Sequence, residues 1–328
     1  MGVPPVRHRY PAAAPPLSGA GGVPLTASSA VGFLVLLALA PVLPGVAAKT
    51  KAVLTGRRGA PLMQLYWDLF RLVRKGAVYS TTTTWIFRLA PVAGLVTPLL
   101  ALGLLPLDGR HALFGFTGDF VGFAALLALG RFTLVLAALD TGSSFEGMGA
   151  SRDATFASLV EPALFLSFVV LALASGQLSL EGMLGGTQAL PWGAAAPALA
   201  MAAASLFFVL LTEASRMPVD DPATHLELTM IHEVTVLDHS GPDLALLLYG
   251  AALRMALFAA LLVGVLASRG RLPGPAALGL LVAGLLTVAV AVGVVESSMA
   301  RFRLSRVPQF LVAASVLASL GAILQLLS

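Results

Sequence analysis

The chain has 328 residues, no cysteine and a formal net charge of +4 at pH 7. Hydrophobic residues make up 58% of it and charged residues only 11%, against about 25% charged residues in soluble domains. This composition excludes a water-soluble globular domain and a disordered chain. The lack of cysteine excludes a disulfide framework and any cysteine-ligated zinc, haem or iron–sulfur centre in this chain.

Residues 1–29 are rich in Pro, Ala and Gly, a composition that predicts a flexible N-terminal tail. A secretory signal is the alternative, with Val31–Ala40 as its apolar core and Ala47-Ala48 as a small-residue cleavage site. The basic stretch that follows at once favours a retained membrane span, so we take residues 30–328 as one transmembrane domain.

Eight apolar stretches follow in chain order, each close to the length that crosses a bilayer as a helix. They are residues 31–47, 86–106, 119–139, 156–175, 194–212, 243–267, 276–295 and 308–327. Backbone groups in lipid must be bonded internally, and the ten-residue alternation of a β-barrel is absent. The sequence therefore predicts an all-α, polytopic membrane protein with about eight transmembrane helices. The first stretch is the weakest, because it is short and carries Pro41 and Pro44.

Basic residues lie in the short segments between these stretches, which is typical of membrane topology and not of nucleic-acid binding. Twelve follow odd-numbered spans: Lys49, Lys51, Arg57, Arg58, Arg71, Arg74, Lys75, Arg152, Arg216, Arg301, Arg303 and Arg306. Five lie on the other side: Arg7, Arg9, Arg110, Arg269 and Arg271. The positive-inside rule then predicts that both termini lie outside and that the odd-numbered loops lie in the cytoplasm.

The segment after the first span, PLMQLYWDLFRLVRKG, carries apolar residues at helical spacing. They are Leu62, Leu65, Tyr66, Leu69, Leu72 and Val73, with Asp68, Arg71, Arg74 and Lys75 mostly opposite. This pattern predicts an amphipathic helix in the cytoplasmic membrane interface, serving as a surface anchor or as a docking rim for a partner.

A polar patch, Asp140–Phe156, separates the third and fourth spans. Its glycines and short polar side chains indicate a compact loop, with Asp140 and Arg152 as candidate partner contacts, or else a flexible linker. Glu161 follows within the fourth span, directly before Pro162. Because proline lacks an N–H group, we expect a local break in the helix there, next to a carboxyl that can titrate.

The segment EASRMPVDDPATHLELTMIHE, Glu213–Glu233, concentrates acidic residues after the fifth span. It holds Glu213, Asp220, Asp221, Glu227 and Glu233, two histidines, His225 and His232, and Arg216 as its only cation. Crowded carboxylates near a membrane favour shared protons, so the segment is a candidate proton-handling site; a solvated acidic loop is the alternative. Asp221 before Pro222 predicts the start of a helix whose apolar face includes Leu226, Met230, Val234 and Leu237.

Sequence motifs for other kinds of chemistry are incomplete or missing. His232-Glu233 begins like a zinc protease motif, but Val236 stands where its second histidine should be. Nucleotide-binding and serine-hydrolase motifs are also missing, so we expect no catalytic residue and no metal in this chain. Charges within spans are costly and are functional candidates by default; Arg131, Arg254 and Glu296 are secondary ones.

The Glu213–Glu233 segment and the HSGPDLALLLYG that follows it resemble one family of membrane subunits. This family includes formate hydrogenlyase subunit 4, hydrogenase-4 component C and subunit 1 (the H subunit) of respiratory NADH dehydrogenase. Asp140–Phe156, Glu161-Pro162, eight spans and an interfacial helix after the first span fit the same family. HLELTMIHE is similar to the hydrogenase branch. Arg216-Met217-Pro218 departs from the quinone-reducing branch, where proline and phenylalanine follow the arginine, and this weighs against quinone binding.

The resemblance implies a non-catalytic anchor and proton-coupling subunit of an oxidoreductase complex. Its partners would be a hydrogenase-like large subunit, an iron–sulfur small subunit and antiporter-like membrane subunits. Iron–sulfur clusters, and nickel–iron where the partner is a hydrogenase, would reside in those partners, and we expect no cofactor in this chain. Glu161, Glu213, Asp220, Asp221, Glu227 and Glu233 match the family's acidic positions, and Arg216 its arginine. The alternatives are a quinone-binding subunit of an NADH:quinone oxidoreductase and a stand-alone ion transporter.

Overall fold

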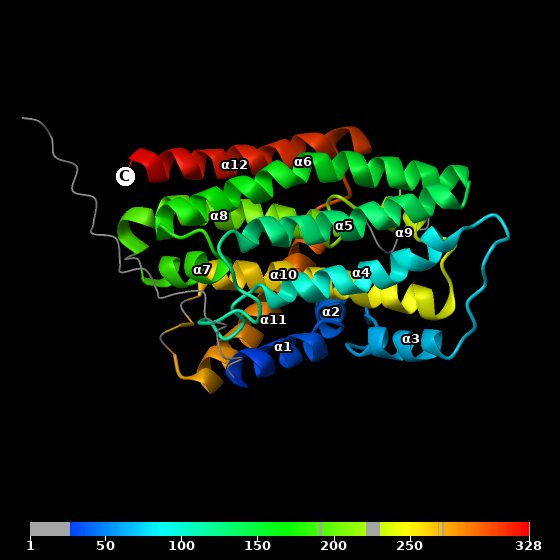
Figure 1. The fold of residues 1–328 in the computed structure, drawn as a ribbon, viewed down its shortest axis with the longest axis horizontal. Helices are drawn as coiled ribbons and strands as arrows, with labels where there is room; N and C mark the ends of the chain where they lie inside the picture. The colour runs from blue at the N-terminus through cyan, green and yellow to red at the C-terminus, as the bar shows by residue number, and fades with distance from the viewer. Residues whose placement is uncertain (1–26, 190–191, 221–229, 268, 271, 328) are drawn as a thin grey trace, which may run out of the picture.

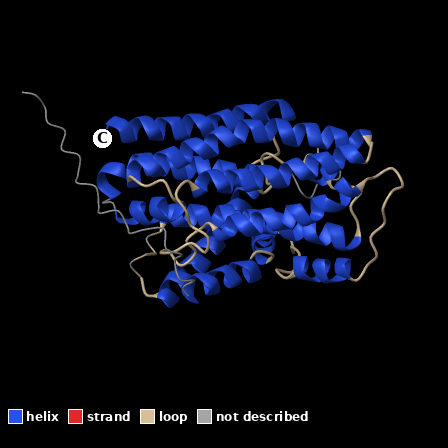
Figure 2. Ribbon diagram, in the orientation of Figure 1, coloured by secondary structure: helices blue, strands red, loops and turns tan. Residues whose placement is uncertain are grey.

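The computed structural model describes residues 27–189, 192–220, 230–267, 269–270 and 272–327, and within them every regular element is a helix (Figure 2). In chain order these are α1 (Ala27–Leu39), α2 (Val42–Leu54), α3 (Gln64–Val73), α4 (Trp85–Gly103), α5 (Asp119–Asp140), α6 (Ser144–Ser175), α7 (Leu180–Ala189), α8 (Trp192–Glu213), α9 (His232–Thr235), α10 (Gly241–Leu266), α11 (Gly274–Ser298), the 3-10 turn η1 (Leu304–Arg306) and α12 (Val307–Leu327). The predicted all-α class is confirmed.

Seven of the described helices are long and apolar enough to cross a membrane, and the bent pair α1 and α2 makes an eighth span when counted as one. The prediction of about eight spans is therefore confirmed. The first span differs from its predicted range, because the helical pair runs from Ala27 to Leu54 and bends by 47°. Pro41 explains the bend, since it has no N–H group to continue the ladder.

Two tyrosines complete the backbone bonding at this bend. The carbonyl of Leu37, four residues before Pro41, accepts a hydrogen bond of 3.0 Å from the Tyr249 hydroxyl of α10. The Ala38 carbonyl accepts one from the Tyr66 hydroxyl of α3. A broken helix within a membrane is tolerated when neighbouring groups bond the freed carbonyls, and these two hydroxyls do so.

Helix α10 is the most buried span and lies in the middle of the bundle (Figure 1). It packs against α4, α8, α11 and α3. Close contact with α4 depends on Gly250, because a Cβ there would collide with the backbone carbonyl of Gly94. Helix α12 covers α6 and α8, and α2 packs on α11, so a ring of helices surrounds α10.

The structure corrects the polar patch at residues 140–156. Asp140 is the last residue of α5, and α6 already begins at Ser144, so most of the patch is helix and not loop. Buried Glu146 holds this first part of α6, because its carboxylate accepts a hydrogen bond of 2.8 Å from the Asp238 amide. The predicted break at Pro162 is also wrong, since α6 runs uninterrupted across it.

The amphipathic helix is present as α3, and its apolar side chains divide into two groups. Leu65, Tyr66, Leu69 and Leu72 are partly buried on the side that packs with α10. Leu62 and Val73, predicted to share that face, are exposed. Placement of α3 in the membrane interface stays a prediction.

The bundle has two ends, visible at the right and left of Figure 1. We call them the α9 end, with residues 55–84, 214–220, 230–240 and 299–306, and the α7 end, with residues 104–118, 176–189 and 267–273 where described. Both the start of α1 and the C-terminus of α12 lie at the α7 end. The expected tail of residues 1–29 lies outside the described residues as far as residue 26, and α1 includes its last three residues.

Candidate proton-coupling site and the adjoining cavity

Arg131 of α5 is the centre of the candidate site. Its guanidinium hydrogen-bonds the carboxylate of Glu213 at the end of α8. It also lies 3.8 Å from an oxygen of Asp153 and 3.9 Å from one of Glu161, both on α6. The Arg131 side chain is 11% exposed and that of Glu213 6%, whereas Glu161 is 44% exposed. One buried cation therefore serves three carboxylates of different accessibility.

Two further groups border this arrangement. Arg254 of α10 is close enough to interact electrostatically with Glu213, Asp153 and Arg131. His232 of α9 is half-buried, and desolvation, followed by the nearby charges of Arg254 and Arg131, lowers its pKa to about 3. Because of this low pKa, His232 is neutral at pH 7 and can donate and accept hydrogen bonds without adding charge.

Asp220 links the residues that flank the segment 221–229. Its carboxylate accepts hydrogen bonds from the amides of Ile231, at 3.3 Å, and His232, at 3.0 Å. The guanidinium of Arg301 bonds its other oxygen at 3.0 Å. This buried carboxylate thus holds α9 against the connection between α11 and α12, and charge-assisted bonds of this kind are the strong ones.

Glu296, near the end of α11, forms a second buried ion pair. Its carboxylate is 3.4 Å from the guanidinium of Arg216 and 4.0 Å from the ammonium of Lys51 on α2. The Lys51 ammonium also contacts the sulfur of Met217 at 3.4 Å. The predicted secondary residue Glu296 therefore belongs to the same end of the bundle as the acidic segment and ties α2 to it.

Cations from distant parts of the chain balance the acidic segment. Within the segment, Arg216 is the only cation, but the fold adds Arg131 to Glu213 and Arg301 to Asp220. Burying a charge without a partner costs several kcal/mol, so these pairs explain how the carboxylates are tolerated. The expectation that crowding alone governs their protonation is replaced by an ionic network.

The other predicted residues have different positions. Asp221, His225 and Glu227 lie outside the described residues. Asp140 accepts hydrogen bonds from the amide and hydroxyl of Thr84 at the start of α4, at 2.6 Å and 2.9 Å, so part of its carboxylate is already engaged within the chain. Arg152 donates to the Met230 carbonyl at 3.0 Å.

Among the described residues, the helix expected from Asp221 onward is shorter than predicted. Met230 and Ile231 are not helical, and α9 comprises only His232–Thr235. Val234 is buried as predicted, but Leu237 is 52% exposed. The apolar face predicted for this helix is therefore wrong at its C-terminal end.

A cavity of about 360 Å³ adjoins the ionic network. Helices α2, α3, α9 and α10 form it, and most of its wall is apolar, including Leu65, Leu244 and Leu248. Its polar lining consists of Ser215, Arg216, Asp220, His232, Glu233 and His239. An apolar chamber with a few polar groups has the character of a small-molecule site.

His239 is a functional candidate that the sequence analysis missed. Its ring stacks on Phe87 with 4.0 Å between centroids, it is 4% exposed, and neither ring nitrogen bonds a described residue. Burial lowers its pKa to about 4, and the charges of Asp243 and Asp238 oppose that shift only in part. A lone histidine before a span gives no sequence signal of this environment. Asp153 was missed for a similar reason, since only the fold brings it to Arg131.

No group of three or more histidine or acidic side chains among the described residues is arranged to hold a metal ion. The carboxylates of Glu213, Asp220 and Glu296 are paired with cations, and that of Asp220 also with backbone amides. Proton transfer and hydrogen bonding are the chemistry that such an arrangement supports.

Comparison with known proteins agrees with this architecture. A family model described as NADH dehydrogenase matches residues 27–327. Hydrogenase-4 component C of Escherichia coli (strain K12) is 35% identical over 239 residues, 73% of this chain and 74% of that protein. Formate hydrogenlyase subunit 4 of the same organism is 31% identical over 282 residues, 84% of this chain and 91% of that protein.

More distant proteins share the fold. NADH-ubiquinone oxidoreductase chain 1 of Triticum aestivum is 26% identical over 69% of this chain and 72% of its own length. A chain of the membrane-bound sulfane sulfur reductase, an archaeal respiratory membrane complex, superposes with a TM-score of 0.76 at 19% identity, covering 91% of this chain and 98% of that one. The resemblance stated from the residues is confirmed, and the chain belongs to the NADH dehydrogenase family of membrane subunits that includes hydrogenase-4 component C and formate hydrogenlyase subunit 4.

Proposed function

We propose that this chain anchors the redox arm of a multi-subunit oxidoreductase complex in the membrane and couples it to proton movement. The observation that carries the proposal is the sharing of Arg131 among Glu213, Asp153 and Glu161. The relatives named as subunits of hydrogenase-4 and formate hydrogenlyase support the assignment to such a complex.

The network suggests how coupling works. While Arg131 bonds Glu213, that carboxylate is held in its charged form. A shift of the guanidinium toward Asp153 or Glu161 would leave Glu213 buried without its cation, and a buried carboxylate in that state takes up a proton. The return of Arg131 would release the proton. A motion of a few ångströms at the α9 end is thereby converted into proton uptake and release.

The redox arm would dock on the α9 end, where the segment 214–220, α9 and residues 299–306 meet. We assign to it a hydrogenase-like large subunit and an iron–sulfur small subunit, with antiporter-like subunits beside this chain in the membrane. The iron–sulfur clusters, and a nickel–iron centre in a hydrogenase-type complex, belong to those partners in this proposal. The excess of basic residues at the α9 end supports its placement in the cytoplasm, with both termini outside.

The test is to replace Glu213 with Gln in the assembled complex. Inverted membrane vesicles that carry the Glu213→Gln complex should keep electron transfer to an artificial acceptor and lose most proton uptake, because the amide cannot exchange a proton. Glu161→Gln should reduce uptake less, since Glu161 is more exposed and lies farther from Arg131. Asp68→Asn on α3, whose carboxylate pairs with exposed Arg71, is the matched control and should leave uptake unchanged. Full uptake in both glutamate variants would refute the proposal.

The cavity favours a second candidate, a quinone-binding subunit. Its apolar wall and polar groups suit a lipophilic molecule with a polar head. A photoreactive ubiquinone analogue should then label α3 or α10, and Leu248→Trp should block labelling by filling the chamber. Labelling that is equal in the variant, or restricted to the lipid-facing helices, would remove this candidate. A stand-alone transporter predicts proton movement by the purified chain in liposomes, which the proposal above does not.

A further inference from the structure

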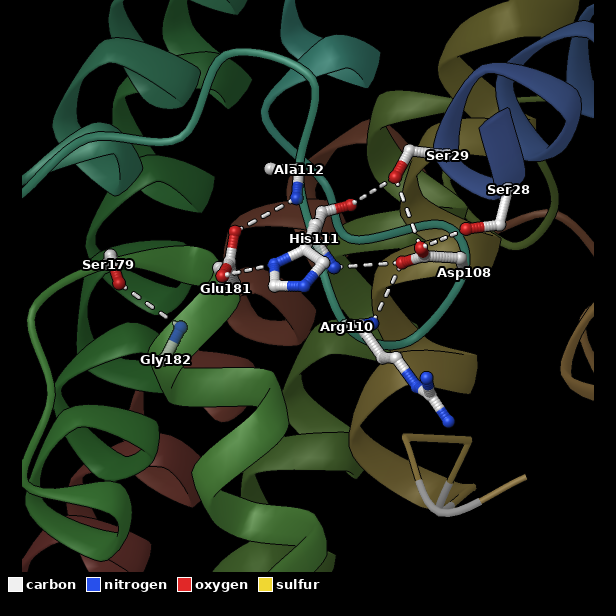
Figure 3. Close-up of polar contacts among 9 residues, drawn as sticks. All are labelled: Ser28, Ser29, Asp108, Arg110, His111, Ala112, Ser179, Glu181 and Gly182. Atoms are coloured by element: carbon white, nitrogen blue, oxygen red, sulfur yellow. Dashed lines mark hydrogen bonds and ion pairs between the residues drawn. The ribbon is translucent and has the colours of Figure 1, made fainter. Parts of the chain in front are cut away.

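A second group of buried polar side chains lies at the α7 end, opposite the candidate site (Figure 3). It joins the start of α1, the loop between α4 and α5, the start of α5 and the start of α7. The charged groups that the described residues bring to this end are Asp108, Arg110, His111, Asp119, Glu181 and Arg269. None of them has a part in the coupling mechanism proposed for the α9 end.

Asp108 is a structural anchor in this group. Its carboxylate accepts hydrogen bonds from the hydroxyls of Ser28 and Ser29 and from the amides of Arg110 and His111, all between 2.8 and 3.1 Å. Burial by itself raises the pKa of Asp108, but these four donors outweigh burial and lower it. A carboxylate with so many donors stays charged and holds the loop to α1.

Arg269 supports the same loop. Its guanidinium, 1% exposed, donates to the Leu107 carbonyl at 3.0 Å. Burial lowers its pKa to about 10 against the opposing charge of Asp108, so it remains a cation at pH 7. Asp108 and Arg269 together fix the position of the loop before Asp119.

Glu181 of α7 connects this loop to the surface. One carboxylate oxygen is 3.1 Å from Nδ1 of His111, and the other accepts the Ala112 amide at 3.0 Å (Figure 3). The His111 side chain is 42% exposed and the Glu181 side chain 27%. This pair forms a hydrogen-bonded connection from the interior to the medium.

Asp119, the first residue of α5, lies on the inner side of this connection. It is fully buried, and its Oδ1 accepts the Leu180 amide at 2.6 Å. Its Oδ2 is also buried and bonds no described residue. Oδ2 and Oε2 of Glu181 face one small space above Gly115, where a Cβ would lie 3.9 Å from the first and 3.4 Å from the second.

Two effects compete at this carboxyl. The N-terminus of α5 favours its charged form, but only weakly. Burial of a carboxylate oxygen without a donor, near another carboxylate, disfavours the charged form more strongly. The second effect is the larger one. A proton on Oδ2, on the side of Glu181, removes this unfavourable buried charge.

We propose that Asp119 binds a proton on Oδ2 beside Glu181 and exchanges it with the outer medium through Glu181 and His111, as a proton site at the α7 end. The role as the outer terminus of proton movement rests on the proposed function, but binding of the proton does not. In the transfer, the O–H bond of Asp119 breaks and its electron pair stays on Oδ2. The proton passes to Glu181 and then to Nδ1 of His111, while Nε2 gives a proton to water.

Infrared difference spectroscopy of the whole chain in lipid nanodiscs tests this site directly. The wild type should show the carbonyl band of a protonated, buried carboxyl at pH 5, and Asp119→Asn should lack it. Asp108→Asn is the matched control, because Asp108 is a buried carboxylate of the same loop whose oxygens all have donors; it should keep the band. An unchanged band in Asp119→Asn, or no such band in the wild type at pH 5, would overturn the proposal.

A second variant keeps the test decisive if Asp119→Asn fails to fold. Glu181→Gln removes the negative neighbour of Asp119, so the band should disappear at a pH about one unit lower than in the wild type. His111→Gln should slow exchange of this proton for deuterium and leave the band in place. An unshifted midpoint in Glu181→Gln would mean that the two carboxyls are independent. The spectra require no turnover, so failure of proton uptake in Glu213→Gln vesicles and failure of this site are separate results.

Discussion

The two ends of the bundle stabilise buried charge in different ways. At the α9 end, each of Glu213, Asp220 and Glu296 lies against a guanidinium from a distant part of the chain. At the α7 end, Asp108 is held by hydroxyls and backbone amides, and Arg269 by a backbone carbonyl. Ion pairs link helices that can move relative to one another, whereas backbone donors fix a loop to a single position.

From this difference we expect the α9 end to rearrange and the α7 end to stay rigid. A shared guanidinium can change partners, and each change alters which carboxylate can take a proton. A carboxylate bonded to its own loop has no alternative partner. We therefore expect conformational coupling at the α9 end and static proton exchange at the α7 end. Substitutions at the two ends should then differ in size and in pH dependence.

The largest effect should follow removal of the shared cation. Arg131→Met leaves Glu213 buried without a partner, and breaking a buried pair in this way costs about 3–5 kcal/mol. The thermal unfolding of the purified chain in detergent should move to a much lower temperature. Arg71→Gln, in an exposed pair with Asp68, is the control and should cost less than about 1 kcal/mol. Equal unfolding temperatures for the two variants would mean that Arg131 is not an essential counter-charge.

At the other end, Asp108→Ala should cost about 1–3 kcal/mol, because two amides lose their acceptor in a buried loop. The serine hydroxyls can turn to other acceptors, so the loss should stay below that of Arg131→Met. Since the pKa of Asp108 is lowered on folding, its contribution is present above the ordinary aspartate pKa near 4 and is lost as the pH falls below it. The unfolding temperatures of wild type and variant should therefore differ at pH 7 and approach each other as the pH falls below about 4. A gap that widens in acid would contradict this sign.

Much of the fold could be predicted because span length and composition depend on local sequence alone. Six helices lie close to their predicted ranges, whereas α6 begins at Ser144 and not at residue 156. The errors occurred where tertiary contacts decide. Glu146 is bonded by Asp238, far along the chain, and this contact converts an apparent loop into the start of α6. Tyr249 bonds a carbonyl at the bend of α1 and α2, which no pattern within residues 31–47 indicates.

The candidate site was predictable only as a list of acids. Glu161 was identified because charges in apolar segments are rare, and Glu213 and Asp220 because acidic residues crowd together after the fifth span. Their partners come from other parts of the chain. Arg131 is 82 residues from Glu213 along the chain, and a single sequence does not show that two such residues are close in space. Asp119 and Glu181 were missed because each stands alone beside a short loop, where an acidic residue is ordinary.

Acid should destabilise the α9 end through a third kind of buried group, a neutral histidine. The pKa of His239 falls from 6.5 to about 4 on folding, so the unfolded chain binds a proton between these values and the folded chain does not. Stability is therefore complete above pH 6.5 and falls as the pH decreases toward 4, by about 1–3 kcal/mol in all. His239→Phe should keep the stack on Phe87, match the wild type at pH 7 and lose less stability at pH 4.5. His232 retains its own acid response, so the dependence should shrink and not vanish.

The smallest effect should come from Tyr249→Phe, which removes one neutral hydrogen bond between α10 and α1 at the middle of the bundle. The hydroxyl donates to the Leu37 carbonyl that Pro41 leaves without an N–H partner. Loss of such a bond costs about 0.5–1.5 kcal/mol, and more when the acceptor stays buried. The unfolding temperature should fall slightly and equally at pH 7 and pH 5, since no charge changes. Tyr79→Phe, near the exposed start of α4, is the comparison and should have no measurable effect on the bend. A loss as large as that of Arg131→Met would show that the bend of α1 and α2, and not the ionic network, limits the stability of the α9 end.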